Sequence, residues 1–116
     1  MEIVFKKKND FDKRCNESEN ILNKYPDRIP IIVEKHKDCN LKNIDKSKYL
    51  VPKDMTMGQF VYIIRKRINL DSSQSLFVSV NGVLASCSET IRYIYDSNKD
   101  EDGFLYVIYT SENTFG

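Results

Sequence analysis

The sequence lacks several features on which small proteins depend for stability or location. It has no tryptophan, only three cysteines, and no Cys-x-x-Cys pair among its 116 residues. An odd number of unpaired cysteines argues against a disulfide framework and favours reduced thiols in a cytosolic or nuclear protein. No stretch approaches the roughly 20 apolar residues of a membrane span. The lysine-rich N-terminus is not a secretory signal, because it has no long apolar region.

The chain also has little net charge, few glycines and a single histidine. The 18 basic and 17 acidic residues nearly cancel, so the balance favours neither a nucleic acid nor an acidic membrane as partner. The four glycines do not have the spacing of a phosphate-binding loop. The single histidine, His36, and nearby Cys39 offer two ligands where structural zinc needs four, and no orienting group or pocket favours a Cys–His nucleophile. We therefore expect no metal, no cofactor and no enzymatic activity.

The length and the aromatic content point to a single domain with its own core. A chain of this size buries roughly two-thirds of its unfolded surface, and seven tyrosines and six phenylalanines supply bulk. Asp10 predicts the start of a helix that ends near Tyr25, because a residue before proline avoids helical angles. The face of this helix that we expect to be apolar holds Phe11, Cys15, Ser18 and Leu22, with Ile21 and Tyr25 beside it. A shorter helix is expected near residues 3–8.

The rest of the chain alternates between strand and helix signals. Residues 29–34 and 49–52 are β-rich, with a polar loop over 36–47, and each proline favours an edge or irregular position. Thr56 and Gln59 form a capping box before a helix with apolar residues at helical spacing. Residues 76–80 predict a strand, Asn81-Gly82 a hairpin turn and Val83 the return. Ser88 or Thr90 can cap a short helix, and residues 104–109 predict the last strand.

The order of these elements predicts the fold class. From the first strand onward it is the ββαββ plan of an α+β, ubiquitin-like β-grasp roll, preceded by two additional helices. We expect an N-terminal helical extension over residues 1–26, a core over 27–110 and a flexible tail over 111–116. A terminal glycine on such a tail is a chemically usable end, since no side chain obstructs a narrow enzyme channel, although a frayed terminus is the plainer interpretation.

Several segments together resemble one family. They are residues 24–30 (KYPDRIP) with 32–35 (IVEK), 45–52 (DKSKYLVP), 58–60 (GQF) with 64–68 (IRKRI), 100–106 (DEDGFLY) and the final Phe115-Gly116. Over essentially its whole length the chain resembles the autophagy ubiquitin-like modifiers, the GABARAP and microtubule-associated light-chain-three family. The resemblance implies a ubiquitin core with two N-terminal helices.

The resemblance also implies a function for the tail. Gly116 matches the glycine that activating and conjugating enzymes join to phosphatidylethanolamine, and Phe115 matches the aromatic residue read by a processing and deconjugating cysteine protease. Nothing follows Gly116, so the chain resembles a processed form. The implied location is the cytoplasm and, after lipidation, the autophagosome or vesicle membrane. Two alternatives remain: a trafficking or microtubule-associated adaptor that is not conjugated, and a modifier attached to proteins.

Finally, the resemblance implies a groove for acidic peptides of the form aromatic-x-x-aliphatic, which add as a strand to an open sheet edge. The first, aromatic-accepting pocket maps to Glu17, Ile21, Pro30, Ile32, Lys48, Leu50 and Phe104. The second, aliphatic-accepting pocket maps to Tyr49, Val51, Pro52, Met55, Phe60, Ile63 and Ile64. Rim charges map to Arg28, Lys46 and Arg67. The apolar members also fit simple core positions, and edge lysines also fit protection against aggregation.

Two basic runs leave three interpretations open. Each run fits a solvated face, a patch that contacts membrane or tubulin, or a nucleic-acid patch. The runs are Lys6-Lys7-Lys8 and Arg65-Lys66-Arg67. We expect no nucleic-acid partner, because no aromatic platform is interleaved with the basic residues.

Overall fold

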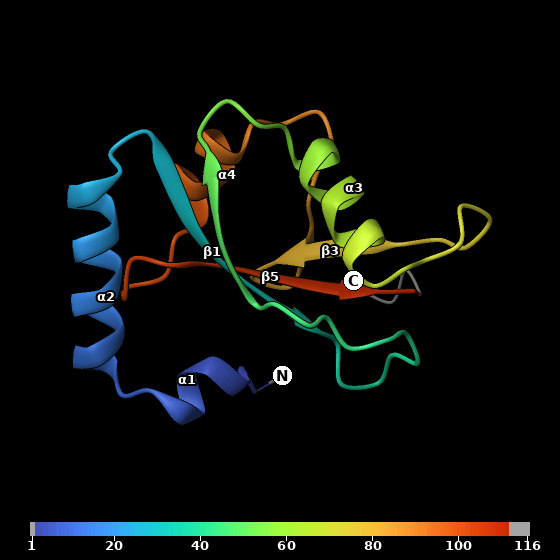
Figure 1. Ribbon diagram of the computed structural model, residues 1–116, viewed down its shortest axis with the longest axis horizontal. Coiled ribbons are helices and arrows are strands. Elements are labelled where there is room, and N and C mark those ends of the chain that lie inside the picture. Colours follow the sequence, from blue (N-terminus) through green and yellow to red (C-terminus); the bar gives the residue numbers. More distant parts are fainter. Residues whose placement is uncertain (1, 112–116) are drawn as a thin grey trace.

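The computed structural model describes residues 2–111. Within this range, four helices and five strands follow one another in the expected order, and Figure 1 shows α3 and α4 on one side of β1 and β5 and α1 on the other. The elements are α1 (Val4–Lys8), α2 (Phe11–Lys24), β1 (Arg28–Lys35), β2 (Lys48–Pro52), α3 (Met57–Arg67), β3 (Phe77–Val80), β4 (Val83–Leu84), α4 (Ile91–Asn98) and β5 (Leu105–Thr110).

The five strands form one mixed sheet in the order β2-β1-β5-β3-β4. The first and last strands are parallel neighbours at its centre, with Ile31 opposite Leu105, and the other pairs are antiparallel. Pro30 lies just before this parallel ladder begins, so its missing N–H removes no bond from it. A central parallel pair with a helix packed across the sheet is the β-grasp arrangement.

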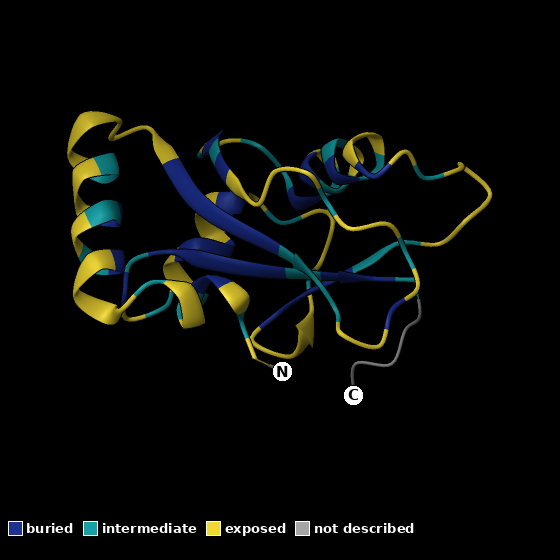
Figure 2. Cartoon of the chain, turned by 60° about the horizontal axis from the view of Figure 1, so that its bottom comes forward, coloured by how far each residue is buried: buried dark blue, intermediate teal, exposed yellow. Residues whose placement is uncertain are grey.

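The two faces of the sheet bury separate clusters. On one face, alternate residues of β1 and β5 pack with α3 and α4 around Phe60 and Ile64, neither of which is exposed. On the other face, Ile32, Phe104 and Tyr106 pack against Phe5 of α1. Figure 2 shows the resulting pattern, with β1 and β5 buried along most of their length and the outer side of α2 exposed.

Local caps start the longer helices where the sequence predicts them. The Asp10 carboxylate accepts from the Lys13 N–H at 2.8 Å. Thr56 and Gln59 make both bonds of the predicted capping box at the start of α3. Of the two caps proposed for α4, the structure uses Thr90. These bonds join residues three apart, which is why the sequence alone predicts them.

The inward face of α2 agrees with the prediction except near the start of the helix. Ser18 of the predicted face is buried, and Cys15, Ile21 and Leu22 are half-buried. Phe11 was also expected on this face, but its side chain is exposed, and Arg14 is buried instead. Arg14 and Ser18 reach the chain just before β5, where Asp102 is buried. A polar docking contact therefore decides the rotation of this helix, and hydrophobic periodicity could not reveal it.

We expect Gly103→Ala to destabilise the fold by about 2–4 kcal/mol, from left-handed strain and overpacking. Gly103 has φ +91°, and an added Cβ would overlap the Ser18 hydroxyl and lie 3.0 Å from Ser18 Cβ. Gly82→Ala is the matched control, because Gly82 has φ +79° but no atom near the added Cβ. In urea unfolding, Gly82→Ala should lose only the free energy that left-handed strain costs, about 1–2 kcal/mol. Equal losses for both variants would show that α2 does not approach Gly103 this closely.

Candidate functional site

The free edge of β2 is the first component of the candidate site. This strand ends the sheet and pairs only with β1. Continuing the β1–β2 register, the Val33 N–H donates to the Ser47 carbonyl at 2.8 Å. Because bonding alternates along an antiparallel pair, the N–H and C=O groups of Lys48 and Leu50 point away from β1. These groups are available to hydrogen-bond a further strand. Pro52 limits the length of that pairing, because it has no N–H to donate.

The predicted first pocket lies between this edge and α2. Its residues come from three strand regions and one helix, on the face of the sheet opposite α3: Glu17, Ile21, Pro30, Ile32, Lys48, Leu50 and Phe104. Ile32 and Phe104 are fully buried and can only form its floor. Ile21 and Leu50 are half-buried, so they present the apolar surface that a ligand could touch. The structure thus brings the predicted residues together but divides them into floor and wall.

Phe5 is a residue of this region that sequence reasoning missed. Its ring packs edge-on against Phe104 at 5.3 Å between centroids. The Lys48 ammonium lies 5.4 Å from the Phe5 centroid. The backbone N–H groups of Val4 and Phe5 donate to the Glu34 carboxylate, which holds α1 in place. A lone aromatic residue in a lysine-rich helix was the available signal, but its position beside the pocket depends on the tertiary fold.

The predicted second pocket lies on the opposite face, between β2 and α3. Its members are Tyr49, Val51, Pro52, Met55, Phe60, Ile63 and Ile64. The rings of Tyr49 and Phe60 are perpendicular, with centroids 5.4 Å apart. Tyr49, Val51, Phe60 and Ile64 are core residues, whereas Met55 and Ile63 are half-buried and Pro52 is exposed. Only these last three can form the accessible wall.

The Tyr49 hydroxyl is an unusual group within this second pocket. Burial raises its pKa, and the nearby Arg67 charge opposes that shift. Within residues 2–111 the buried hydroxyl has no hydrogen-bond partner of good geometry. The pocket therefore has a polar atom at its floor, which an aliphatic ligand group would leave unsatisfied.

Cationic side chains line the outer side of the groove. Lys48 Nζ lies 2.5 Å from Glu17 Oε2, and Arg28 Nη1 reaches the Leu50 carbonyl oxygen at 3.4 Å. Lys46 Nζ lies 5.2 Å from the Tyr49 ring centroid. These side chains are exposed or partly exposed, so each contact is worth at most about 1 kcal/mol and yields readily to a ligand.

Arg67, the third predicted rim residue, is already paired. Its Nε lies 3.2 Å from Asp45 Oδ1, and a second nitrogen reaches Asp45 Oδ2 at 3.4 Å. Both side chains are exposed. The structure therefore places Arg67 at the α3 end of the groove, where the Asp45 carboxylate offsets part of its charge.

The predicted conjugation residues, Phe115 and Gly116, lie outside the described residues. The chain that leads to them is anchored at the end of β5. The Tyr109 hydroxyl donates to the Lys42 carbonyl at 2.7 Å, and Cys39 Sγ lies 3.8 Å from the Ser111 hydroxyl. The tail thus starts from a fixed point at one end of the sheet.

The basic runs differ from the expected pattern in one respect. Tyr62 is exposed on α3, and Lys66 Nζ lies 5.0 Å from its ring centroid, so an aromatic residue does accompany this run. In the other run, Lys6 pairs with Asp100 and Lys7 with Glu2. A single aromatic ring is less than the series of stacking platforms that single-stranded nucleic acids need.

The described part of the chain contains neither a metal-ligand cluster nor a membrane-spanning helix. Within residues 2–111, no three His, Cys, Asp or Glu side chains come together in a group that could hold a metal ion. None of the helices in that range is both long and apolar enough to cross a bilayer.

The fold and the open sheet edge define a ubiquitin-like protein with an N-terminal helical extension. Residues 13–116 match the family model described as "Autophagy protein Atg8 ubiquitin like". Autophagy-related protein 8e of Arabidopsis thaliana is 55% identical over 113 residues, which are 97% of this chain and 93% of that protein. Autophagy-related protein 8 of Mycosarcoma maydis is 53% identical over 116 residues, which are 100% of this chain and 98% of that protein.

A solved structure agrees with these sequence matches. The crystal structure of Trypanosoma brucei ATG8 superposes with a TM-score of 0.92 at 40% identity, covering 100% of both chains. The chain therefore belongs to the Atg8 family of ubiquitin-like autophagy proteins. The predicted family and the predicted α+β β-grasp fold with N-terminal helices are confirmed.

Proposed function

We propose that this protein is an autophagy modifier that is joined through Gly116 to phosphatidylethanolamine and recruits receptors with acidic aromatic-x-x-aliphatic motifs. It would act as a substrate of conjugation and a docking platform, with no catalytic group of its own. Its partners would be activating and conjugating enzymes, a cysteine protease and motif-bearing receptors. It would reside in the cytoplasm and, once lipidated, on autophagosomal or vesicle membranes.

The observation that carries the receptor-binding half of this proposal is the unpaired edge of β2. An added strand could bond to the outward groups of Lys48 and Leu50, while alternate side chains would point to the two faces of the sheet. One side chain would reach the Ile21 side and the other the Met55 side. This geometry matches a motif with two apolar anchors on opposite faces of one extended segment.

Charge supports an acidic segment. Lys46, Lys48 and Arg28 lie along the outer side of the same edge. The Lys48–Glu17 ion pair is partly exposed, with side-chain exposures of 51% and 28%, so a peptide carboxylate can compete with Glu17 at small cost. An acidic peptide would add favourable long-range attraction that salt should weaken.

The conjugation half of the proposal is a balanced acyl transfer. The Gly116 carboxylate would be adenylated by ATP with release of pyrophosphate, and a cysteine thiol would then displace AMP to form a thioester. The amine of phosphatidylethanolamine would attack the thioester, forming an amide and freeing the thiol. Two acyl chains are enough for stable membrane anchoring. Conjugation would thus supply the membrane attachment that none of the described helices can provide.

Reconstitution tests the conjugation proposal and its alternatives. The chain is incubated with activating and conjugating enzymes, ATP and phosphatidylethanolamine liposomes, and the product is analysed by mass spectrometry. We expect the added mass of the phospholipid. A lysine isopeptide as the main product would support a modifier of proteins. No conjugate, together with undiminished cellular function after removal of Gly116, would support the unconjugated adaptor.

We expect Lys48→Glu and Leu50→Ala each to weaken binding of an acidic aromatic-x-x-aliphatic peptide by roughly tenfold, the loss typical of one good polar or apolar contact. Lys48→Glu removes the cation and places a second carboxylate beside Glu17. Leu50→Ala removes half-buried apolar surface without changing charge. Titration calorimetry measures both affinities.

Lys99→Glu is the matched control for the charge change. Lys99 is exposed and follows Asn98, which contacts Asn81 at the β3–β4 turn on the far side of the sheet. We expect it to leave the peptide affinity nearly unchanged. If Lys99→Glu weakens binding as much as Lys48→Glu does, net charge and not the β2 edge determines binding.

A further inference from the structure

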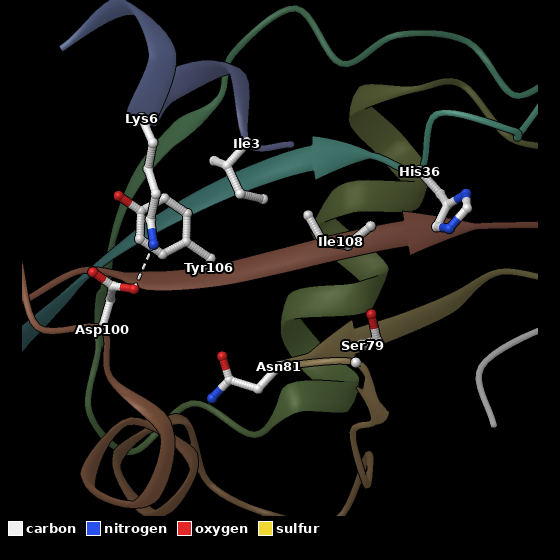
Figure 3. Close-up of a pocket in the computed structure, with 9 residues that line it drawn as sticks. Ile3, Lys6, His36, Ser79, Asn81, Asp100, Tyr106 and Ile108 are labelled. Atoms are coloured by element: carbon white, nitrogen blue, oxygen red, sulfur yellow. Dashed lines mark hydrogen bonds and ion pairs between the residues drawn. The ribbon is translucent and has the colours of Figure 1, made fainter. Parts of the chain in front are cut away.

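The Tyr49 hydroxyl is a buried polar group that has no hydrogen-bond partner in the part of the chain that the structure describes. Arg14 Nε is the other such atom there, but it has an ionic partner, because Asp102 Oδ2 lies 3.2 Å away. The hollow between α1 and β5 shows the usual pairing of polar groups, with Lys6 Nζ 2.6 Å from Asp100 Oδ1 (Figure 3). An unpaired buried hydroxyl costs free energy, so it points to a partner that the free protein does not supply.

Packing fixes the position of the Tyr49 hydroxyl. Tyr49 is 9% exposed, and its ring lies edge-on to the Phe60 ring, with 5.4 Å between the centroids. The Lys46 ammonium lies 5.2 Å from the Tyr49 centroid. Because the ring is held by a core phenylalanine of α3, a hydrogen-bond partner has to move to the hydroxyl.

A weak ion pair lies next to this hydroxyl. Arg67 contacts the Asp45 carboxylate through two nitrogens, at 3.2 and 3.4 Å. The Arg67 and Asp45 side chains are 40% and 68% exposed, so solvent screens their attraction. Burial has the largest effect on the pKa of Tyr49 and raises it, while the Arg67 charge lowers this pKa and the Asp45 charge raises it. Both charged groups are therefore neighbours of a hydroxyl that has no well-aligned bond to either.

An acidic peptide at the β2 edge would disturb this ion pair. A peptide carboxylate that binds Arg67 leaves the Asp45 carboxylate beside it, and two like charges at one site repel each other. The Tyr49 hydroxyl can offset this repulsion, because a hydroxyl that donates to a carboxylate forms a strong, charge-assisted hydrogen bond. Asp45 is exposed enough to turn towards the hydroxyl.

We propose that Tyr49 is a specificity-determining residue for acidic peptides. When a peptide carboxylate takes Arg67, Asp45 turns away and accepts a hydrogen bond from the Tyr49 hydroxyl. The hydroxyl thus favours peptides that have a carboxylate in contact with Arg67 over peptides that have an amide there. The proton stays on Tyr49, and no covalent bond changes. This inference rests on the proposed binding of acidic peptides at the β2 edge.

Titration calorimetry of the full chain with matched peptides tests the proposal. The parent is an acidic aromatic-x-x-aliphatic peptide, and each companion replaces one of its carboxylates with the corresponding amide. The carboxylate that binds Arg67 is the one whose replacement weakens binding to the wild type but not to Arg67→Ala. Tyr49→Phe should weaken binding of the parent roughly three- to tenfold. It should weaken binding of the companion without that carboxylate clearly less.

Two controls separate this contact from general effects of the substitution. Tyr62→Phe makes the same chemical change at an exposed position of α3, and it should leave the affinity for the parent unchanged. Urea unfolding of Tyr49→Phe should show an unchanged or higher midpoint, because the deleted hydroxyl has no partner in the free protein. A purely structural role of the hydroxyl would lower that midpoint.

Asp45→Ala removes the proposed acceptor and completes the test. In this background Tyr49→Phe should cause no further loss of affinity for the parent. A persisting loss would mean that the hydroxyl contacts the peptide itself, and it would overturn the proposal. Equal losses for parent and companion, or no carboxylate coupled to Arg67, would overturn it as well. If the wild type binds no peptide of the set, the proposed groove is wrong and this inference falls with it.

Discussion

Replacing Gly116 with alanine is expected to reduce conjugation to phosphatidylethanolamine by at least roughly 100-fold. The reaction takes place at the carbonyl next to the Cα of residue 116, and misplacement of reacting groups by about 1 Å can cost that much. A methyl group on this carbon crowds the tetrahedral intermediate and closes backbone angles that only glycine adopts freely. The measurement is the gel shift and phospholipid mass in the reconstituted reaction.

The expected effect of Gly116→Ala is specific to chemistry at the terminus. Gly116 lies beyond β5, which ends at Thr110, so we expect unchanged urea unfolding and unchanged affinity for the acidic peptide. Asn113→Ala is a matched control that alters the same tail without touching the reacting residue, and it should be conjugated normally. Equal conjugation of Gly116→Ala and the wild type would refute the role proposed for this glycine.

Replacing Asp102 with alanine is expected to lower the free energy of unfolding by about 3–5 kcal/mol, because it leaves a buried cation without its partner. Asp102 is 1% exposed, and its carboxylate lies 3.2 Å from Arg14 Nε. The Phe104 N–H donates to Oδ1 at 2.8 Å, and the Tyr106 hydroxyl donates to Oδ2 at 2.5 Å. Burial and this carboxylate together raise the pKa of Tyr106, so the hydroxyl stays a donor.

The Arg14–Asp102 pair allows a sharper test than one substitution. Arg14 Nε has no hydrogen-bond partner of good geometry within residues 2–111, so the contact with Asp102 is chiefly ionic. The single variants of this test are Arg14→Met and Asp102→Asn, and each leaves one buried charge without its partner. The double variant removes both charges, so it should recover most of the stability that either single variant loses, since buried pairs are often replaceable together. Urea unfolding of the two single variants and the double variant gives the coupling energy. Additive losses would show that the two side chains do not depend on each other.

The same network connects stability to the proposed groove. Arg14 and Ser18 fasten α2 to the chain before β5, and Glu17 and Ile21 on the same helix form the wall of the first pocket. Loss of Asp102 should thus also weaken peptide binding in conditions where the protein remains folded. Gly103, which allows the close approach to Ser18, belongs to the same contact.

Sequence reasoning placed the helices and strands well where the signal was local. The capping box at Thr56 and the Asn81-Gly82 turn both join residues within a few positions of each other, and both positions of that turn have positive φ. Predictions from the sequence were weaker where a contact joins residues that lie far apart along the chain. The parallel pairing of β1 with β5 joins residues more than 70 positions apart, and no local pattern specifies it.

The candidate site divides in the same way. The resemblance to relatives predicted which residues form the groove, and the structure places these residues on the two faces of the sheet beside β2. It could not distinguish Phe104, which is buried in the floor, from Ile21, which remains accessible. It also missed Phe5, because a side chain in a five-residue helix gains its role only when that helix docks on the sheet.

The family, the order of elements, the caps and the turn could be predicted from the residues alone, since they depend on short-range geometry and on residues shared with relatives. The burial of Arg14 on α2 and the accessibility of each residue beside β2 could not be predicted in this way. Burial and hydrogen-bond satisfaction depend on neighbours that only folding brings together. A residue such as Arg14, charged yet buried, takes its position from a partner far along the chain.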